Sequence, residues 1–255
     1  MRELPAAPSF RLDGKRALIT GAGRGIGLAA AAALAEQGAA VVLIARSKDE
    51  IEAGAEAIRA RGFPAEAMHL DVTDLAAVQT QIGGAAPFDI LLNNAGTNRP
   101  KPITDVTIED FDAVIGLNVR AAYFVAQAAA KNMIASGRKG SIIHMSSQMG
   151  QVGGRNRTLY CASKWAIEGL NKALALDLAP YGIRSNTIAP TFIETEFTAP
   201  FFADAAFKTS VLDKIKLGRI GQVEDVTGAV VFLASEASAL MTGSTITVDG
   251  GWTAD

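Results

Sequence analysis

Three residues in the middle of the chain, Ser147, Tyr160 and Lys164, have the types and spacing of a proton-transfer site. A tyrosine and a lysine four residues apart on a helix lie on the same face, one turn from each other. The ammonium group would favour the ionised phenol, so the pKa of Tyr160, near ~10 for a free tyrosine, would fall towards neutrality. Such a phenol exchanges a proton with an alcohol or carbonyl oxygen, which a serine hydroxyl can hold in place. Ordinary amphipathic helices also contain this spacing, so the rest of the chain must show whether these residues form a proton-transfer site.

A glycine-rich loop near the start of the chain indicates a bound dinucleotide. The apolar run 16–20 leads into Gly21, Gly25 and Gly27, and an alanine-rich helical pattern follows. A strand, a glycine loop and a helix in this order can bind a pyrophosphate, because the backbone can approach the phosphates and the helix N-terminus offers N–H donors. The spacing G-x3-G-x-G differs from the common G-x-G-x-x-G, since Ile26 stands where the last glycine would be. A glycine-rich turn without a ligand is the alternative.

The end of the second apolar run, 39–45, bears on the choice between NADP and NAD. An acidic residue about 20 residues after the glycines would hydrogen-bond the ribose hydroxyls of NAD. Ala45 stands there instead, and Arg46 follows it. Together with Arg24 from the glycine loop, Arg46 could pair with a 2′-phosphate, which a carboxylate would repel. The sequence therefore favours NADP(H), with NAD(H) possible, and the alternative is that both arginines are solvated surface charges.

Polar residues stand out at three further places, of which the first two suit the same ligand. Asp71 follows the third apolar run and could accept the adenine amino group, or be a capping carboxylate at the start of the next helix, for which Thr73 is also a candidate N-cap. Small and amide residues at 93–96 follow the fourth run and suit a backbone close to a ribose, or a plain turn. Asn118 lies in an apolar helical stretch, where an amide is costly unless it is satisfied.

These residues require a scaffold of alternating strands and helices. Such alternation along the whole chain predicts one α/β domain over 1–255, with a doubly wound, mostly parallel seven-stranded sheet and helices on both faces, which is Rossmann-like. The phenylalanine-rich stretch 191–217 has weak periodicity and is interpreted as a substrate lid or loop. The predicted strands are 16–20, 39–45, 65–70, 88–92, 140–147, 182–189 and 244–248, and the predicted helices 28–37, 49–61, 107–131, 159–178 and 222–236.

The composition excludes several functional classes. A net charge of −2 at pH 7 offers no basic surface for nucleic acid or an anionic membrane. No window approaches the ~18 apolar residues that a membrane-spanning helix needs, and residues 1–10 lack the apolar run of a signal peptide. The single cysteine excludes an internal disulfide and is typical of a reducing compartment. We therefore expect a cytoplasmic protein with a small-molecule substrate, no nucleic-acid or membrane partner, and no metal site.

Taken together, these segments resemble the short-chain dehydrogenase/reductase family in its compact form. They follow the family order and cover nearly the whole chain, so chance agreement is a poor explanation. The chain departs from the family at Thr191, which follows Pro190 where glycine is usual. A Cβ there restricts the backbone beside the nicotinamide. The matching segments are 20–27, 71–72, 93–96, Asn118, Ser147, 160–164 and 190–195.

The resemblance implies a role for each matched residue. It makes Tyr160 the general acid when a ketone is reduced and the base when an alcohol is oxidised, with Lys164 lowering its pKa and binding the nicotinamide ribose. Ser147 would orient the substrate oxygen, and Asn118 would help to hold a water that connects Lys164 to bulk solvent. The expected cofactor site, with the two arginines included, consists of Gly21, Gly23, Arg24, Gly25, Ile26, Gly27, Arg46, Asp71, Val72, Asn94, Ala95, Gly96, Tyr160, Lys164, Pro190, Ile193 and Thr195.

The expected function is an NADP(H)-dependent oxidoreductase that interconverts a ketone and a secondary alcohol by hydride transfer. Charged residues near the expected pocket (Arg155, Arg157, Glu194 and Glu196) favour a polar substrate such as a sugar or polyol, whereas the phenylalanines of the lid favour an apolar one. Two alternatives are an NAD(H)-dependent dehydrogenase of the same family and a non-catalytic nucleotide sensor. The resemblance also implies a homotetramer, or a homodimer, with the helices 107–131 and 159–179 packed between subunits.

Overall fold

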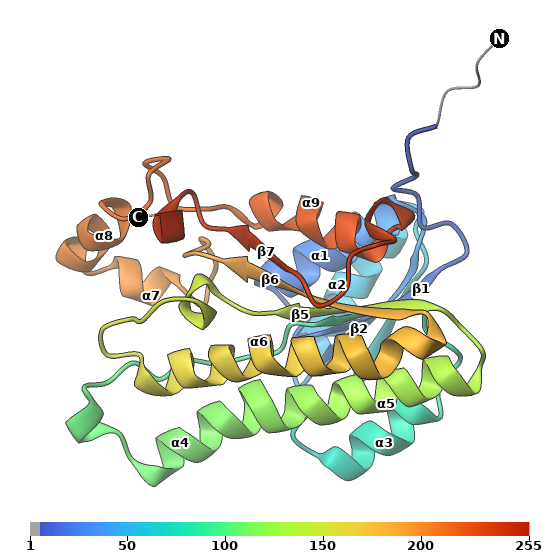
Figure 1. Cartoon of the computed structure of the whole chain (residues 1–255), viewed down its shortest axis with the longest axis horizontal. Coiled ribbons are helices and arrows are strands. Elements are labelled where there is room, and N and C mark those ends of the chain that lie inside the picture. The colour runs from blue at the N-terminus through green and yellow to red at the C-terminus, as the bar shows by residue number, and fades with distance from the viewer. Residues whose placement is uncertain (1–5, 255) are drawn as a thin grey trace.

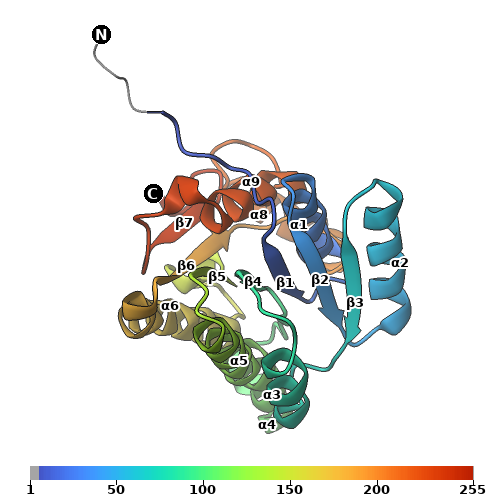
Figure 2. The same cartoon turned by 90° about the vertical axis from the view of Figure 1, so that its right-hand side faces the viewer.

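A single parallel sheet runs through the part of the chain that the computed structural model describes, residues 6–254 (Figures 1 and 2). Its strand order is β3-β2-β1-β4-β5-β6-β7, and every neighbouring pair is parallel. The predicted seven-stranded, doubly wound sheet is thus confirmed. The strands are β1 (Arg16–Thr20), β2 (Ala40–Ala45), β3 (Ala65–His69), β4 (Ile90–Asn93), β5 (Gly140–Met145), β6 (Ile183–Pro190) and β7 (Thr245–Val248).

Helices cover both faces of this sheet, which is why its central strands are apolar on both sides. One buried cluster joins one face to α1, α2 and α9, and a second joins the other face to α3, α5 and α6. Figure 2 shows the two layers on either side of the sheet. The helices are α1 (Gly25–Glu36), α2 (Lys48–Ala60), α3 (Leu75–Gly83), α4 (Ile108–Ile115), α5 (Ala122–Ala135), α6 (Thr158–Leu178), α7 (Ala199–Phe202), α8 (Ala205–Leu212) and α9 (Val223–Ala234).

The strand order reverses at β1, and this sets the place of the functional site. β1 pairs with β2 on one side and β4 on the other, so the loops that follow β1 and β4 leave in opposite directions. In open parallel sheets, ligands bind in the crevice at the carboxyl ends of the strands where this reversal occurs. Both the glycine loop and the segment 93–96 lie at that point.

The predicted helix 107–131 is interrupted. A π-helical segment, Gly116–Ala121, separates α4 from α5, and it contains Asn118. π-helical turns are rare and often mark functional sites. The remaining short elements are 3₁₀ turns at Ile103–Asp105, Gln148–Gly150, Ala179–Tyr181, Glu236–Ser238 and Trp252–Ala254.

One smaller expectation is corrected. Thr73 is not the N-cap of α3: Asp74 is, and its carboxylate accepts from the backbone N–H of Ala77. Thr73 is unavailable because its hydroxyl and backbone N–H both donate to Asp71. The stretch 191–217, called the lid below, contains α7 and α8, and its role as a substrate lid or loop stays a prediction.

The expectation that no stretch could span a membrane also needs correction. The helical stretch Ile108–Ala135 has 28 residues and is long and apolar enough to do so by length and composition. Half of its most apolar window is buried inside the structure, however, and Val125, Ala129 and Met133 belong to the core. We interpret this stretch as a core helix. One domain over 1–255 stays a prediction, and residues 1–5 and 255, including part of the segment inspected for a signal peptide, lie outside the described residues.

Candidate active site

A cavity of about 450 Å³ opens at the carboxyl ends of the strands. Every residue expected in the cofactor site lines it, together with Ser147. The expectations missed several other lining residues, among them Ser47, Glu50, Thr97 and Thr198. Among residues 6–254, no group of three or more His, Cys, Asp or Glu side chains is placed to hold a metal ion.

The glycine loop has the shape that a pyrophosphate requires. Gly21 and Gly25 have φ of 64° and 55°, which glycine adopts without strain. A Cβ on Gly27 would lie 2.2 Å from the carbonyl oxygen of Gly21, so only glycine fits there. No side chain caps the start of α1, and its first N–H groups remain available to a ligand. These residues therefore fit the phosphates of a dinucleotide.

A buried threonine that the motif reading missed holds this loop. The Thr20 hydroxyl accepts hydrogen bonds from the backbone N–H groups of Asn94 and Ala95, each at 3.0 Å. In return, the Asn94 side-chain amide donates to the carbonyl oxygens of Thr20 and Gly21. Asn94 thus fixes the loop, and it also lines the cavity.

Several charged side chains, among them Arg24, Arg46 and Asp71, line the cavity. Arg24 contacts Glu50 and Glu196 at 3.4 and 3.3 Å, whereas Arg46 has no ion pair within residues 6–254. Partial burial acts to raise the pKa of Asp71, but hydrogen bonds from Thr73 and the charge of Arg46 lower it overall. Arg46 is therefore the cation here that is available to a 2′-phosphate.

The expected catalytic residues converge from two elements. Ser147 follows β5, donates its hydroxyl to Gln148 Oε1 at 2.8 Å and accepts from the N–H of Met149. Tyr160 and Lys164 lie in the first turns of α6, and Lys164 Nζ is 5.5 Å from the centre of the Tyr160 ring. Lys164 is only 5% exposed and donates to the carbonyl oxygen of Met145 at 2.8 Å.

The pKa values of this group differ from the sequence expectation. Burial raises the pKa of Tyr160 to about 12, although Ser147 and the charge of Arg157 act to lower it. Burial also lowers the pKa of Lys164 to about 8. The expectation that Lys164 holds the pKa of Tyr160 below its ordinary value is wrong for this structure, because desolvation of the phenolate dominates and the ammonium group is directed at a β5 carbonyl.

Asn118 lies behind the cavity rather than in its wall. Its side chain accepts from the N–H of Thr97 and donates to the carbonyl oxygen of Thr97 and the hydroxyl of Ser163. The Ser163 hydroxyl donates in turn to the carbonyl oxygen of Tyr160. The buried amide of Asn118 is thus satisfied by hydrogen bonds, and these bonds join the segment after β4 to α6. The role of Asn118 towards a water molecule stays a prediction.

A smaller cavity of about 70 Å³ adjoins the catalytic side chains. It is lined by Ser147 and Tyr160 on one side and by residues of the lid on the other. The lid phenylalanines contact one another: Phe192 lies 5.6 Å from Phe207 and 5.7 Å from Trp252 between ring centres. The complete lining is Asn98, Ser147, Gln148, Met149, Arg157, Tyr160, Thr191, Phe192, Phe197, Thr198 and Phe201.

Comparison with known proteins gives consistent matches along the chain. A family model described as enoyl-(acyl carrier protein) reductase matches residues 21–253. The L-xylulose reductase of Bos taurus is 38% identical over 246 residues, covering 96% of this chain and 99% of that protein. The gluconate 5-dehydrogenase of Gluconobacter oxydans is 39% identical over 251 residues, covering 96% of each. A crystal structure of a gluconate 5-dehydrogenase from Burkholderia cenocepacia, in complex with NADP and tartrate, superposes with a TM-score of 0.93 at 41% identity, covering 96% of this chain and 98% of that one.

The depressed pKa of Lys164 predicts how stability depends on pH. The unfolded chain keeps a proton on this lysine up to its ordinary pKa of 10.5, whereas the folded chain releases it at about 8. Between these values the unfolded state binds more protons, so the free energy of unfolding contributed by Lys164 rises with pH. Urea unfolding at about pH 8 and about pH 10 should show this rise in the wild type and not in Lys164→Met. The exposed Lys172, on the same helix, provides the control: Lys172→Met should keep the wild-type dependence, and an equal dependence in all three proteins would contradict the assignment.

Proposed function

Since the chain belongs to the short-chain dehydrogenase/reductase family of NAD(P)-dependent oxidoreductases, we propose that it interconverts a ketone and a secondary alcohol of a sugar-like substrate, with NADP(H) as cofactor. The observation that carries this proposal is the meeting of Ser147, Tyr160 and Lys164 at the wall of a cavity that the dinucleotide motifs also line. The activities named for the relatives, on L-xylulose and on gluconate, support a hydroxylated substrate.

The side chains present can supply the proton transfer. A reduced nicotinamide supplies a hydride, with its two electrons, to the carbonyl carbon. As the carbonyl π bond breaks, Tyr160 donates its phenolic proton to the oxygen, and the Ser147 hydroxyl stabilises the developing charge. A pKa of about 12 keeps the phenol protonated and ready to donate. In the reverse direction the ionised Tyr160 takes the proton of the alcohol as the hydride leaves its carbon for the oxidised nicotinamide, and Lys164, which lines the same cavity, would hold the nicotinamide ribose.

Tyr160→Phe tests the assignment directly. The ring and its packing remain, but the proton donor is lost, so kcat should fall by about 10² to 10⁴-fold while NADPH binding is kept. Steady-state rates measure the first effect, and the fluorescence of bound NADPH measures the second. Tyr181→Phe, at an exposed tyrosine on another part of the surface, should leave both unchanged. Undiminished turnover in Tyr160→Phe would defeat the proposed role, and a wild type that binds NADPH but turns over no carbonyl compound would favour the nucleotide sensor.

The preference for NADP(H) is proposed to rest chiefly on Arg46. Arg24 already forms two ion pairs, whereas Arg46 forms none within residues 6–254 and acts on Asp71 only through its charge at longer range. Removal of a charge-assisted hydrogen bond costs about 1.5–3 kcal/mol. Arg46→Ala should therefore raise the KM for NADPH by roughly 10 to 150-fold and change the KM for NADH little. Lys48→Ala, a neighbouring exposed cation outside the cavity lining, should change neither. An equal loss with both cofactors, or a wild type that prefers NADH, would support the NAD alternative.

A homotetramer is the proposed assembly, with a homodimer as the alternative. Large apolar side chains are exposed on the outer helices α4, α5 and α6: Phe111, Tyr123 and Trp165. In Figure 1, α6 lies alongside the long helical stretch that α4 and α5 form end to end. Exposed apolar patches of this kind usually mark interfaces. Light scattering after gel filtration should give the mass of four chains, and Trp165→Glu should reduce it. Leu240→Glu, at a fully exposed leucine outside these helices, should not. A monomeric wild type would exclude both assemblies.

A further inference from the structure

Arg157, the residue before α6, is a buried cation with no ion-pair partner in the described part of the chain. It is only 7% exposed. Its Nη1 makes one long hydrogen bond, 3.4 Å, to the carbonyl oxygen of Asn156, and its buried Nε has no partner. A guanidinium carries five N–H donors, and burial lowers its pKa, which measures how unfavourable this environment is for the charge. Buried cations are normally paired with an anion.

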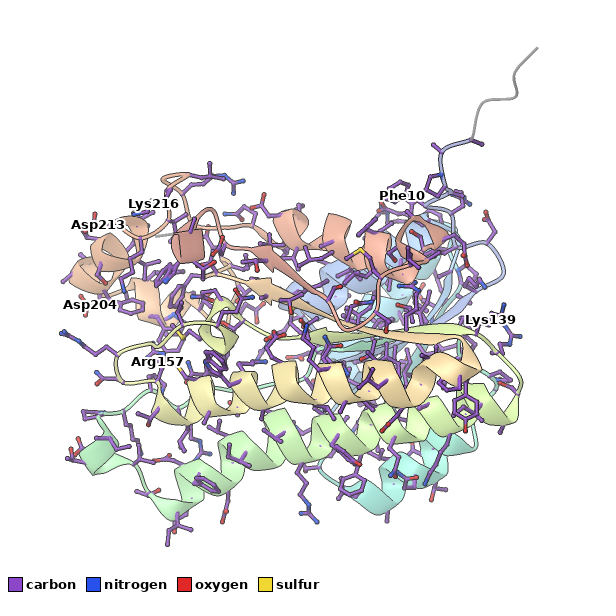
Figure 3. The ribbon with its side chains drawn as sticks, in the orientation of Figure 1. Phe10, Lys139, Arg157, Asp204, Asp213 and Lys216 are labelled. Carbon is purple, nitrogen blue, oxygen red and sulfur yellow. The ribbon has the colours of Figure 1, made fainter. Side chains whose placement is uncertain are left out.

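Aromatic rings shield this guanidinium without satisfying its donors. The Cζ atom of Arg157 lies 5.4 Å from the centre of the Phe201 ring and 5.8 Å from that of Phe207. Ring faces attract a cation but leave its N–H groups without a full acceptor. Figure 3 shows Arg157 at the start of α6, below the lid helices α7 and α8. The lid therefore excludes water from a charge that still lacks a hydrogen-bonding partner.

Three acidic side chains of the lid stretch 191–217 have partners of their own. Glu194 accepts from the amide of Gln222, Glu196 contacts Arg24, and Asp204 caps α8 by accepting from the N–H groups of Ala206 and Phe207. All three are exposed. The described residues thus provide no carboxylate to balance Arg157.

The smaller cavity points to a ligand as the missing partner. Arg157 is the only formally charged residue among the described residues that line it, and Ser147 and Tyr160 line it as well. A second buried polar atom without a partner, Oγ1 of Thr191, belongs to another lining residue. A substrate whose reacting carbon lies at Tyr160 would therefore be in the same pocket as the Arg157 guanidinium and the Thr191 hydroxyl.

We propose that Arg157 binds a carboxylate of the substrate, and that the substrate class is therefore sugar acids rather than neutral sugars or polyols. The proposal rests on the proposed function and specifies its substrate. A planar guanidinium forms two parallel hydrogen bonds with a carboxylate, and a site sheltered from water strengthens them. One cation balances one carboxylate, whereas a phosphate dianion would leave a charge without a partner. The carboxylate is unchanged in the reaction: the secondary alcohol loses a hydride to NADP⁺ and a proton to Tyr160, and a keto acid and NADPH result.

A different role for Arg157 would be to act only on Tyr160, since its charge lowers the pKa of that phenol. This role predicts a loss that is equal for all substrates and a shifted pH profile of kcat. Carboxylate binding predicts instead a loss confined largely to acids and expressed in KM. Pairs of substrates that differ only at the terminal carbon, a carboxylate in one and a hydroxymethyl group in the other, distinguish the two roles.

The test uses pairs of compounds that differ only in a terminal carboxylate or hydroxymethyl group: D-gluconate with D-glucitol, galactonate with galactitol, mannonate with mannitol, and xylonate with xylitol. Initial rates of NADP⁺ reduction give kcat/KM for each. The wild type should prefer the acid of its best pair by at least about tenfold, as expected for a charge-assisted pair. In Arg157→Met this ratio should fall towards about one, through a higher KM for the acid. Arg157→Lys should give an intermediate ratio, because lysine keeps the charge but cannot form two parallel hydrogen bonds with the carboxylate.

Arg155→Met is the matched control. Arg155 lies two residues before Arg157 and carries the same charge, but its side chain is exposed and lines neither cavity. Its acid-to-polyol ratio should equal that of the wild type. A thermal shift in the presence of NADPH, larger for the acid than for the polyol and absent in Arg157→Met, gives a readout that needs no turnover, and circular dichroism verifies that each variant is folded.

The outcomes distinguish this proposal from the proposed function. A wild type that oxidises polyols as well as acids, or an Arg157→Met variant that loses both equally, overturns the carboxylate site and leaves the oxidoreductase intact. Preference for D-glucitol 6-phosphate over D-gluconate also overturns it, in favour of a phosphate site. Failure to turn over any compound with either cofactor counts against the proposed function, and the thermal shifts then decide alone whether Arg157 binds carboxylates.

Discussion

A chain of hydrogen bonds that begins at the buried hydroxyl of Thr20 connects the two halves of the site. Thr20 accepts from the backbone after β4 and thereby locks the end of β1 to the end of β4, where the strand order reverses. From that backbone the connection continues through Thr97 to Asn118, then to Ser163, and ends at the carbonyl oxygen of Tyr160. Because each of these groups is satisfied by the next, the glycine loop and the catalytic helix are held at a fixed separation. The geometry of hydride and proton transfer depends on that separation.

The site also combines three groups whose charged forms are disfavoured by desolvation. Burial raises the pKa of Tyr160 and lowers the pKa values of Lys164 and Arg157. Burial is the main cause of each shift, so the charged form of each group is costly in the folded chain unless a partner stabilises it. For Arg157, the proposed partner is a carboxylate of the substrate. A pocket with aromatic walls and one buried cation favours a ligand that brings its own negative charge.

The sequence predicted the sheet and the cofactor crevice well, because apolar runs and the spacing of Gly21, Gly25 and Gly27 are local signals. Features that depend on side-chain direction were not predictable in the same way. Whether Arg155 or Arg157 is buried depends on how the loop before α6 packs against the lid, and the pattern of apolar residues in the sequence contains no signal for that packing. Likewise, the direction of Lys164 towards a β5 carbonyl and the anchoring role of Thr20 arise only when β1, β4, β5 and α6 are packed together. The local signal for that anchor is a threonine that ends a strand directly before a glycine loop.

The π-helical segment Gly116–Ala121 has a consequence for how the long helical stretch tolerates changes in length. A π turn contains one residue more than an α-helical turn, so it offsets the angular phase of α5 relative to α4. Each residue of a regular helix advances the phase by about 100°. Deletion of one residue here would regularise the helix, but it would also rotate Val125, Ala129 and Met133 away from the sheet, or else turn α4 away from its own contacts. The extra residue is therefore a built-in phase correction: it allows one continuous helix to present Asn118 to α6 and an apolar face to the core.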